Sequence, residues 1–160
     1  IVNAGGDNDS GIDLATNDQI LLKVANATRL TMNATGQTTI VGEGGTTTTS
    51  LQQGLNKAWT HFQGTSTAAS VDGLNISSVD DDGTGDHGLH FTNNMANATY
   101  CVPIGVDDDN SSQSVIEVDT SNGTMATTGF DFEGYFLNSS TNRTNLDIAN
   151  IYLVIIGDLA

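Results

Sequence analysis

Basic side chains are scarce in this sequence. Four lysines and arginines stand against 19 aspartates and glutamates, and the formal net charge of the 160 residues is −15 at pH 7. Binding to nucleic acid depends on clustered Lys and Arg side chains that contact phosphates, and an anionic membrane surface selects for the same residues. Neither partner is expected, and the acidic composition instead favours solubility and tolerance of salt.

Cysteine and long apolar runs are also nearly absent. Cys101 is the only cysteine, so no intrachain disulfide can form, and its place in the apolar run ATYCVPIGV predicts a buried, unreactive thiol. No stretch approaches the roughly 18 apolar residues of a membrane span, so no membrane insertion is expected. The chain opens with Ile1 and without a signal-peptide pattern, which predicts a fragment or a processed product.

The residues that favour helices are few as well. Glu, Lys and Leu are uncommon in the sequence, whereas Thr, Val and Ile, which suit strands, are frequent. Apolar and polar residues alternate along much of the chain, and this regular pattern argues against disorder. The length fits one compact domain with an extension. The sequence therefore predicts an all-β protein.

Residues 1–49 are expected to form a β-stranded stem segment. Alternating apolar pairs stand between the turn signals ATND, ANAT and NATGQ: Ile12 and Leu14, Leu22 and Val24, Leu30 and Met32. Such a segment has too few large apolar side chains for a core of its own, so other chains are expected to cover them, as in a trimer with a shared interior. GEGGTTTTS, at 42–50, lacks periodicity and predicts a linker.

Residues 50–160 are expected to form a C-terminal head domain. Ser50 is a candidate N-cap for a short helix over 51–57. Strand patterns then recur with turns about every ten residues, which is typical of a β-sandwich or a jelly roll. In AWTHF, Ala58, Thr60 and Phe62 are expected on one face and Trp59 and His61 on the other. The remaining strand candidates are VDGLNISSV, GLHFT, ATYCVPIGV, SVIEV and TTGFDFEGYFLN, with Phe130, Phe132 and Tyr135 inward. The final NIYLVIIGD is apolar on both faces, which predicts a central strand or one that also meets a neighbouring subunit.

The acid-rich stretch SSVDDDGTGDHGLHF, at 77–91, has three interpretations. A helix-loop-helix calcium site needs acids at alternate positions and Glu at position twelve, but Asp80, Asp81 and Asp82 are consecutive and position twelve is Phe91. Paired catalytic carboxylates must converge across a cleft, and nothing in the sequence indicates one. The interpretation we favour is a hairpin connection, in which Asp and Gly fill the turn between two strands.

Other chemical motifs also favour ordinary structure. His61, His87 and His90 are expected to be packed or solvated, because His87 and His90 would not converge on a strand. GEGG lacks the Lys and the strand-to-helix setting of a phosphate loop. No Ser-His-Asp arrangement can be defended, so we expect no enzyme activity, no cofactor and no metal.

Asn-x-Ser/Thr triplets occur nine times, starting at Asn8, 26, 33, 75, 97, 110, 122, 138 and 142. The 16 Asn and 34 Ser and Thr of the 160 residues predict 16 × 34/160, about three, by chance. One interpretation is a glycosylated surface. The interpretation we favour is turn chemistry, because Asn and small hydroxyl residues suit turns and some copies lie within or beside predicted strands.

Several short motifs follow one another in residues 51–157: KAW at 57–59, NISS at 75–78, DGTGD at 82–86, FT at 91–92, Met95, Tyr100 and the final NIYLVIIGD. In this order they resemble the C-terminal (distal) domain of bacteriophage tail fibres and related virion appendages. The segment GIDLATNDQILLKVANATRLTMNATGQTTI is similar to the stem repeats that precede such domains. HGLHF departs from the family pattern, because many relatives carry an aromatic residue directly after GD, so His87 is expected to replace a packed ring.

The resemblance implies a homotrimeric distal domain of a virion fibre, which contacts other tail or fibre proteins and mediates host attachment. The family carries no motif of binding residues, so candidates come from exposure and composition alone. Loops 80–86, 107–113 and 138–145 offer polar side chains that suit the hydroxyls of a host glycan or a surface protein. The candidate receptor-binding residues are Asp81, Asp82, Thr84, Asp108, Asn110, Asn138 and Asn142.

Alternative functions remain open at this point. A capsid-decorating structural fibre would have the same architecture without receptor binding. A secreted cell-surface adhesin or pilus-like subunit would fit the composition, and glycosylation at several Asn would favour it. A hydrolase of surface polysaccharide is disfavoured, because such activity usually requires a longer β-helix with acids in a groove.

Overall fold

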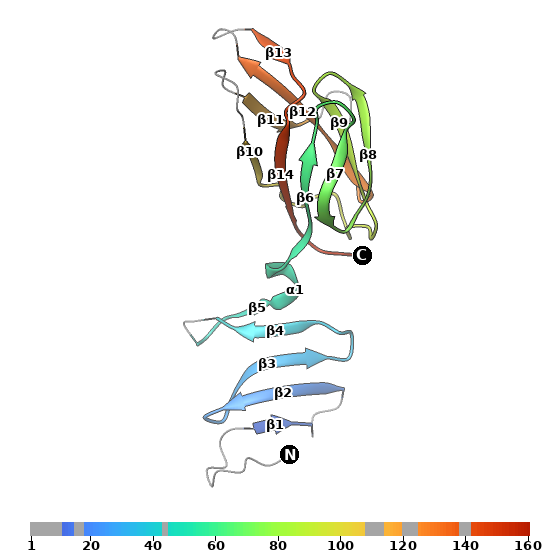
Figure 1. Cartoon of the computed structure of the whole chain (residues 1–160). Coiled ribbons are helices and arrows are strands. Elements are labelled where there is room, and N and C mark those ends of the chain that lie inside the picture. Colours follow the sequence, from blue (N-terminus) through green and yellow to red (C-terminus); the bar gives the residue numbers. More distant parts are fainter. Residues whose placement is uncertain (1–10, 15–17, 43–44, 108–113, 120–124, 138–141) are drawn as a thin grey trace. The chain divides into compact units, whose positions relative to one another are not determined.

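The computed structural model describes residues 11–14, 18–42, 45–107, 114–119, 125–137 and 142–160 (Figure 1). Nearly all of the regular structure is antiparallel β, and the only helix in these residues is the short α1 (Leu51–Gly54). The predicted all-β class is therefore confirmed. The chain divides into two compact units, the N-terminal unit Ile1–Leu55 and the C-terminal unit Asn56–Ala160.

The N-terminal unit contains one sheet, whose strands follow chain order. These strands are β1 (Gly11–Asp13), β2 (Gln19–Val24), β3 (Ala27–Asn33), β4 (Thr38–Val41) and β5 (Thr48–Ser50). Segment 42–50 is therefore not the linker that we predicted. The Gly42 amide donates to the Thr47 carbonyl at 2.8 Å, and β5 pairs with β4 because its Thr residues suit a strand.

Helix α1 begins as predicted but ends earlier. The Ser50 hydroxyl accepts from the Gln53 amide at 3.3 Å, so Ser50 is the N-cap. The helix stops at Gly54, a poor helix former, and Asn56 already belongs to the next strand. Its Gln52 side chain accepts from the Thr38 amide at 3.0 Å and donates to the Gly36 carbonyl at 2.8 Å, which fastens the helix to the N-terminal sheet.

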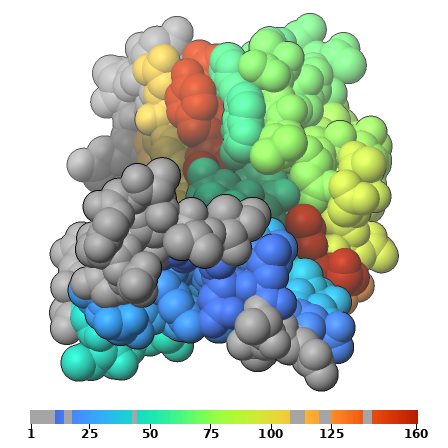
Figure 2. Space-filling model, turned by 90° about the horizontal axis from the view of Figure 1, so that it is seen from below, coloured from blue at the N-terminus to red at the C-terminus, as the bar shows by residue number. Residues whose placement is uncertain are grey.

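The C-terminal unit is a sandwich of two antiparallel sheets. The front sheet has the order β10 (Ile104–Asp107), β14 (Asn150–Ile156), β6 (Asn56–Gln63) and β7 (Ala69–Leu74). The back sheet has the order β11 (Ser114–Val118), β12 (Gly129–Leu137), β9 (Asp86–Phe91) and β8 (Ile76–Gly83), and β13 (Arg143–Asn145) pairs with β12. Strand β14 lies between β10 and β6, so its prediction as a central strand is confirmed (Figure 2).

An aromatic core fills the space between the two sheets. Phe62 of β6 meets Phe132 of β12 edge to face, with ring centroids 5.1 Å apart. The Tyr100 ring packs on Phe91, and its hydroxyl donates to the carbonyl of Gly129 at 2.8 Å. Burial raises the pKa of Tyr100 to about 12. The inward positions predicted for Phe130 and Phe132 are confirmed, and the face of AWTHF that carries Ala58, Thr60 and Phe62 is the buried one.

The stretch VDGLNISSV is two strands and not one. Strands β7 and β8 belong to different sheets, and the chain turns between them at Asn75, whose φ is +62°. The Asn75 amide group donates to the Lys57 carbonyl at 3.1 Å and its carbonyl accepts from the Asn93 amide at 2.7 Å. Leu74 and Ile76 alternate in the sequence, but the corner places them in separate sheets, where Leu74 is exposed and Ile76 packs against the core.

Two other predictions about burial are wrong. Tyr135 does not point inward, because alternation from Phe132 places Gly134 on the core side and the Tyr135 hydroxyl donates to Glu117 at 3.2 Å. Cys101 is exposed, because the neighbouring Tyr100 takes the inward position in the same extended segment.

The turn interpretation of the Asn-x-Ser/Thr triplets is confirmed at two positions. The Asn33 side-chain carbonyl accepts from the Thr35 hydroxyl at 2.7 Å, and the Asn97 side-chain carbonyl accepts from the Thr99 amide at 2.9 Å. Both are local turns closed by the Asn side chain. The triplets that start at Asn8, 110, 122 and 138 lie outside the described residues.

Candidate functional site

The acid-rich stretch 77–91 forms the two strands and the turn of the β8–β9 hairpin, so the predicted hairpin connection is confirmed. The aspartates were predicted to lie in the turn, but β8 continues past Val79 to Gly83 and includes all three consecutive aspartates. The turn requires Gly85, whose φ is +73° and whose added Cβ would lie 2.3 Å from the Gly134 carbonyl oxygen. The Gly85 amide donates to the Asp147 carboxylate at 2.6 Å, which fixes the turn.

The outer face of the back sheet is acidic. Cross-strand pairing places five carboxylates on this side, and we call it the acidic face: Asp80, Asp86, Glu117, Asp131 and Glu133. Burial, and then repulsion from Asp82, raise the pKa values of Asp86 and Asp131. The Asp80 carboxylate lies 2.6 Å from the imidazole of His90.

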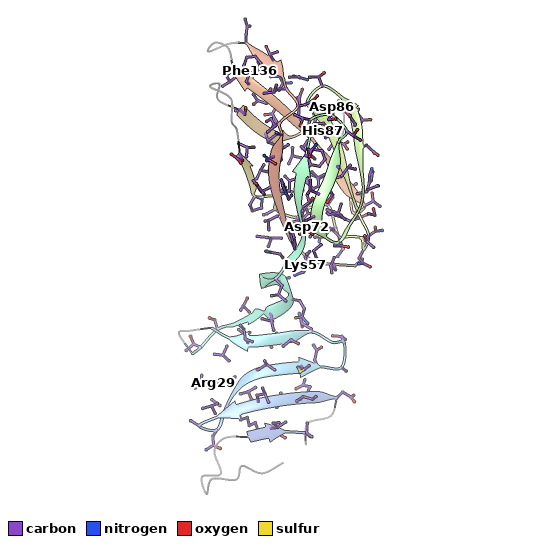
Figure 3. The ribbon with its side chains drawn as sticks, viewed as in Figure 1. Arg29, Lys57, Asp72, Asp86, His87 and Phe136 are labelled. Carbon is purple, nitrogen blue, oxygen red and sulfur yellow. The ribbon has the colours of Figure 1, made fainter. Side chains whose placement is uncertain are left out.

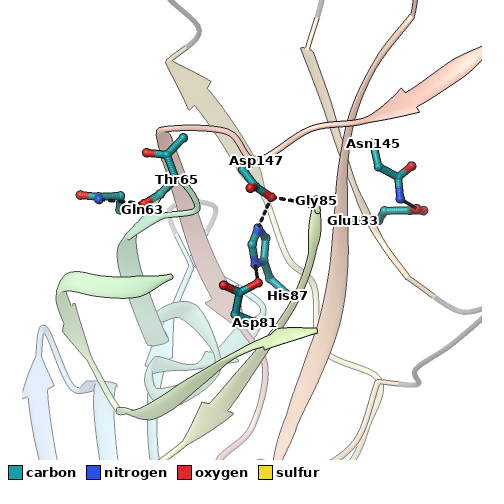
Figure 4. Close-up of polar contacts among 8 residues, drawn as sticks. All are labelled: Gln63, Thr65, Asp81, Gly85, His87, Glu133, Asn145 and Asp147. Atoms are coloured by element: carbon teal, nitrogen blue, oxygen red, sulfur yellow. Dashed lines mark hydrogen bonds and ion pairs between the residues drawn. The ribbon is translucent and has the colours of Figure 1, made fainter. Parts of the chain in front are cut away.

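One arginine neutralises part of the acidic face. The Arg143 guanidinium of β13 lies 2.7 Å from Glu117 and 3.0 Å from Glu133, and it also covers the Tyr135 ring at 5.2 Å. The Asn145 amide group donates to Glu133 at 2.8 Å (Figure 4). These contacts join β11, β12 and β13.

His87 lies inside the sandwich beside the same turn. Its side chain is 1% exposed and packs against the rings of Phe62 and Phe132, with centroids 5.0 and 5.7 Å away. Its Nδ1 lies 4.0 Å from Asp81 and its Nε2 lies 3.8 Å from Asp147, and neither nitrogen has a hydrogen-bond partner (Figure 4). Burial lowers the pKa of His87 although both carboxylates act to raise it. The expectation of a packed ring at this position is confirmed.

The outer face of the front sheet is apolar and aromatic, and we call it the aromatic face. One cross-strand row runs from Leu74 through Trp59 to Val154, whose amide donates to the Pro103 carbonyl at 3.1 Å. The adjacent row contains Asp72, His61, Tyr152 and Gly105. Leu74 is 51% exposed and Tyr152 is 45% exposed, so this side has a wide uncovered apolar surface.

A shallow hollow of about 450 Å³ lies on the aromatic face. The residues that line it are Asn56, Trp59, Thr60, His61, Tyr152, Leu153 and Val154. The rings of His61 and Tyr152 stack with centroids 4.9 Å apart and an interplanar angle of 21°. The His61 Nε2 lies 2.9 Å from the side-chain oxygen of Asn150, which fixes the imidazole in this position.

Four of the seven predicted receptor-binding residues lie in the part of the chain that the structure describes. Asp81 and Asp82 lie in β8, Thr84 lies in the turn that follows, and all three are exposed. Asn142 is exposed just before β13. Asp108, Asn110 and Asn138 lie outside the described residues. The turn with Asp86 and His87 lies at the end of the unit opposite to Lys57 (Figure 3).

The aromatic face was not predicted as a site. Two signals in the sequence point to it: NIYLVII is apolar on both sides of a strand, and AWTHF places Trp59 and His61 together on the side away from the core. A strand that is apolar on both sides is also expected where both faces of its sheet are buried by other parts of a protein. Neither signal alone therefore distinguishes an exposed binding surface from a buried one.

No metal or membrane site emerges from the part of the chain that the structure describes. Within it, no three His, Cys, Asp or Glu side chains are grouped so that they could hold a metal ion. No helix in these same residues is long and apolar enough to cross a membrane.

Comparisons with known proteins identify no family. No family model, curated protein or solved structure matches the chain. The relation to virion fibres therefore rests on the motifs quoted above, and it is developed below as a proposal.

Proposed function

We propose that this chain is the distal part of a homotrimeric virion fibre that attaches to the surface of a host cell. The observation that carries the proposal is the apolar side of the N-terminal sheet, which has no second layer within the described residues of its own unit. Exposed apolar side chains on or beside the sheet strands of that unit are Ile12, Leu14, Ile20, Leu22, Val24 and Met32. A one-layer sheet needs a partner for such a side, and further copies of the same chain can provide it.

The number of copies rests on the resemblance to fibre domains. Three sheets around one axis would cover three apolar sides in a closed, symmetric arrangement, whereas two sheets face to face would form a dimer. The charge of −15 on each copy opposes association, so the interface must be the apolar side and not the acidic surface.

Attachment is supported by the two outer faces of the C-terminal unit, one of which is acidic and the other apolar and aromatic. A fibre tip needs exposed surface that can recognise a host molecule, and several identical tips raise a weak affinity through multivalency. Loops 80–86, 107–113 and 138–145, with the candidate residues named in them, belong to this proposal.

Competition for adsorption tests the attachment function. Purified protein added to host cells should reduce adsorption of the parent virus, and antibodies against the protein should label the tips of the particle's fibres. Labelling over the whole capsid without any competition would instead indicate a decorating protein and would contradict the proposal.

A further inference from the structure

We infer that the aromatic face of the C-terminal unit is a binding site for a neutral saccharide. The inference rests on the proposed attachment function and names the chemical class of its receptor. It places a saccharide site in the hollow around Trp59 and Tyr152, in addition to the loops named above.

The aromatic floor of the hollow suits a sugar ring. One side of a pyranose ring presents C–H bonds, and this apolar side packs on the flat face of Tyr or Trp. One face of the Tyr152 ring stacks on His61, and Gly105, which has no side chain, is the partner of Tyr152 in β10 on the other side, so the second face of the ring stays open to a ligand. Trp59 lies diagonally across from Tyr152 and extends the floor along β6.

Polar groups at the edge of the hollow suit hydroxyls. Asn56 and His61 line it together with the aromatic rings, and the Tyr152 side chain brings a phenolic hydroxyl. A small number of oriented polar groups around an apolar floor is the usual composition of a ligand site. The His61 imidazole is oriented by Asn150, so its position does not have to be fixed when a ligand binds.

Charge around the hollow selects for a neutral ligand. Asp72 is the cross-strand partner of His61, and Asp107 is the partner of Asn150, so carboxylates flank the row that carries Tyr152. No Lys or Arg lines the hollow. An anionic saccharide would meet these carboxylates and the strongly negative chain, whereas a neutral one would not.

The single tryptophan of the chain makes the site directly measurable. Trp59 lies in the hollow, so the intrinsic tryptophan emission of the full-length protein reports on this surface alone. We would titrate the protein with maltoheptaose, mannohexaose and galactohexaose as neutral probes, and with oligogalacturonate as an anionic probe. The expected result is a saturable change in Trp59 emission with at least one neutral probe and no change with the anionic one.

Two variants locate the binding. Tyr152→Ala removes the stacked ring and should weaken binding about tenfold or more, which corresponds to ~1.4 kcal/mol. Tyr135→Ala is the matched control, because it removes a tyrosine from the back sheet, and it should leave the titration unchanged. Equal weakening by both variants would overturn the assignment, and so would the absence of a response to all three neutral probes.

The test separates this inference from the proposed function. An oligomer of the expected mass whose emission ignores every neutral probe would refute the saccharide site and leave the fibre proposal in place. A monomer that binds a neutral probe through Tyr152 would keep the site and refute the trimer. Trp59 emission that changes with protein dilution and not with sugar would show that a second copy covers the face, which also overturns the inference.

Discussion

Leu22 of β2 and Leu30 of β3 are cross-strand partners at the centre of the apolar side of the N-terminal sheet. The same cross-strand row continues to Ile12 of β1 and to Ile40 of β4. Four adjacent strands thus place a large aliphatic residue on one side at the same level. The sheet forms a single layer, so these four side chains have no core to pack into within their own unit. Association of several copies would bury them.

A charge placed in this row should break the association. Leu22→Asp puts a carboxylate into the proposed interface, where burial without a partner costs several kcal/mol. The variant should elute and scatter as a monomer. Thr31→Asp is the matched control: it adds the same charge to the same sheet, but Thr31 pairs with Leu21 on the other side. Loss of association in both variants, or in neither, would contradict the proposed role of the apolar side.

Acidic pH should destabilise the C-terminal unit through His87. Burial holds the pKa of His87 below its usual 6.5. As the pH falls through 6.5 the unfolded chain takes up a proton before the folded one, so stability decreases until the pH reaches the lowered pKa. Thermal unfolding between pH 7.5 and 5.5 measures this slope. His87→Leu removes the titrating group, and it should flatten the slope if the assignment is correct.

The carboxylates around His87 act in the opposite direction. Asp147, Asp81, Asp86 and Asp82 all raise the pKa of His87, and they limit the effect of burial. The pKa values of Asp86 itself and of Asp131 are raised above 3.8, so their contribution to stability is present at low pH and is lost as the pH rises through the raised values. An unchanged slope in His87→Leu would contradict the assignment to His87, and these aspartates could not explain it, because their raised pKa values favour the folded state as the pH falls.

Truncation of the aromatic core should cost far more than a surface change. Phe132 is fully buried and contacts the rings of Phe62, His87 and Phe130. Phe132→Ala should reduce the free energy of unfolding by about 3–5 kcal/mol. Val71→Ala, at an exposed position of β7, should change it by less than about 0.5 kcal/mol in the same chemical denaturation experiment. A small loss at Phe132 would mean that the two sheets do not pack as described.

A side chain at Gly85 should disrupt the turn between β8 and β9. Gly85→Ala would meet the Gly134 carbonyl at 2.3 Å and would also have to adopt φ +73°. The left-handed conformation alone costs about 1–2 kcal/mol for a residue with a Cβ. Gly54→Ala is a useful comparison, because nothing lies within 4 Å of its added Cβ and Ala favours helix α1. The melting temperature should fall only for Gly85→Ala, and a fall for neither variant would refute the described turn.

Much of the fold could be predicted from the sequence, because alternation in a strand depends on local residues. The division of AWTHF into two faces, the central position of NIYLVII and the cap at Ser50 follow from periodicity and side-chain chemistry. Alternation cannot tell which sheet a strand joins, so the corner at Asn75 was missed. Pairing partners also cannot be read locally, and for that reason the Thr-rich strand β5 was taken for a linker.

The site was harder to predict than the fold. Acidic loops are conspicuous in a sequence, whereas the aromatic face combines Trp59, His61 and Tyr152 from strands that are far apart in the chain. Only the pairing of β6 with β14 brings these residues together. An exposed apolar residue and a core residue look the same in a sequence, and their difference depends on what covers the sheet.

The solution mass of the full-length protein tests the central claim most directly. Multi-angle light scattering should give three times the mass of the 16.6 kDa chain, with no smaller species on dilution. That result would agree with three copies that share the apolar side of the N-terminal sheet. A monomer of 16.6 kDa would contradict the fibre proposal and leave that side uncovered.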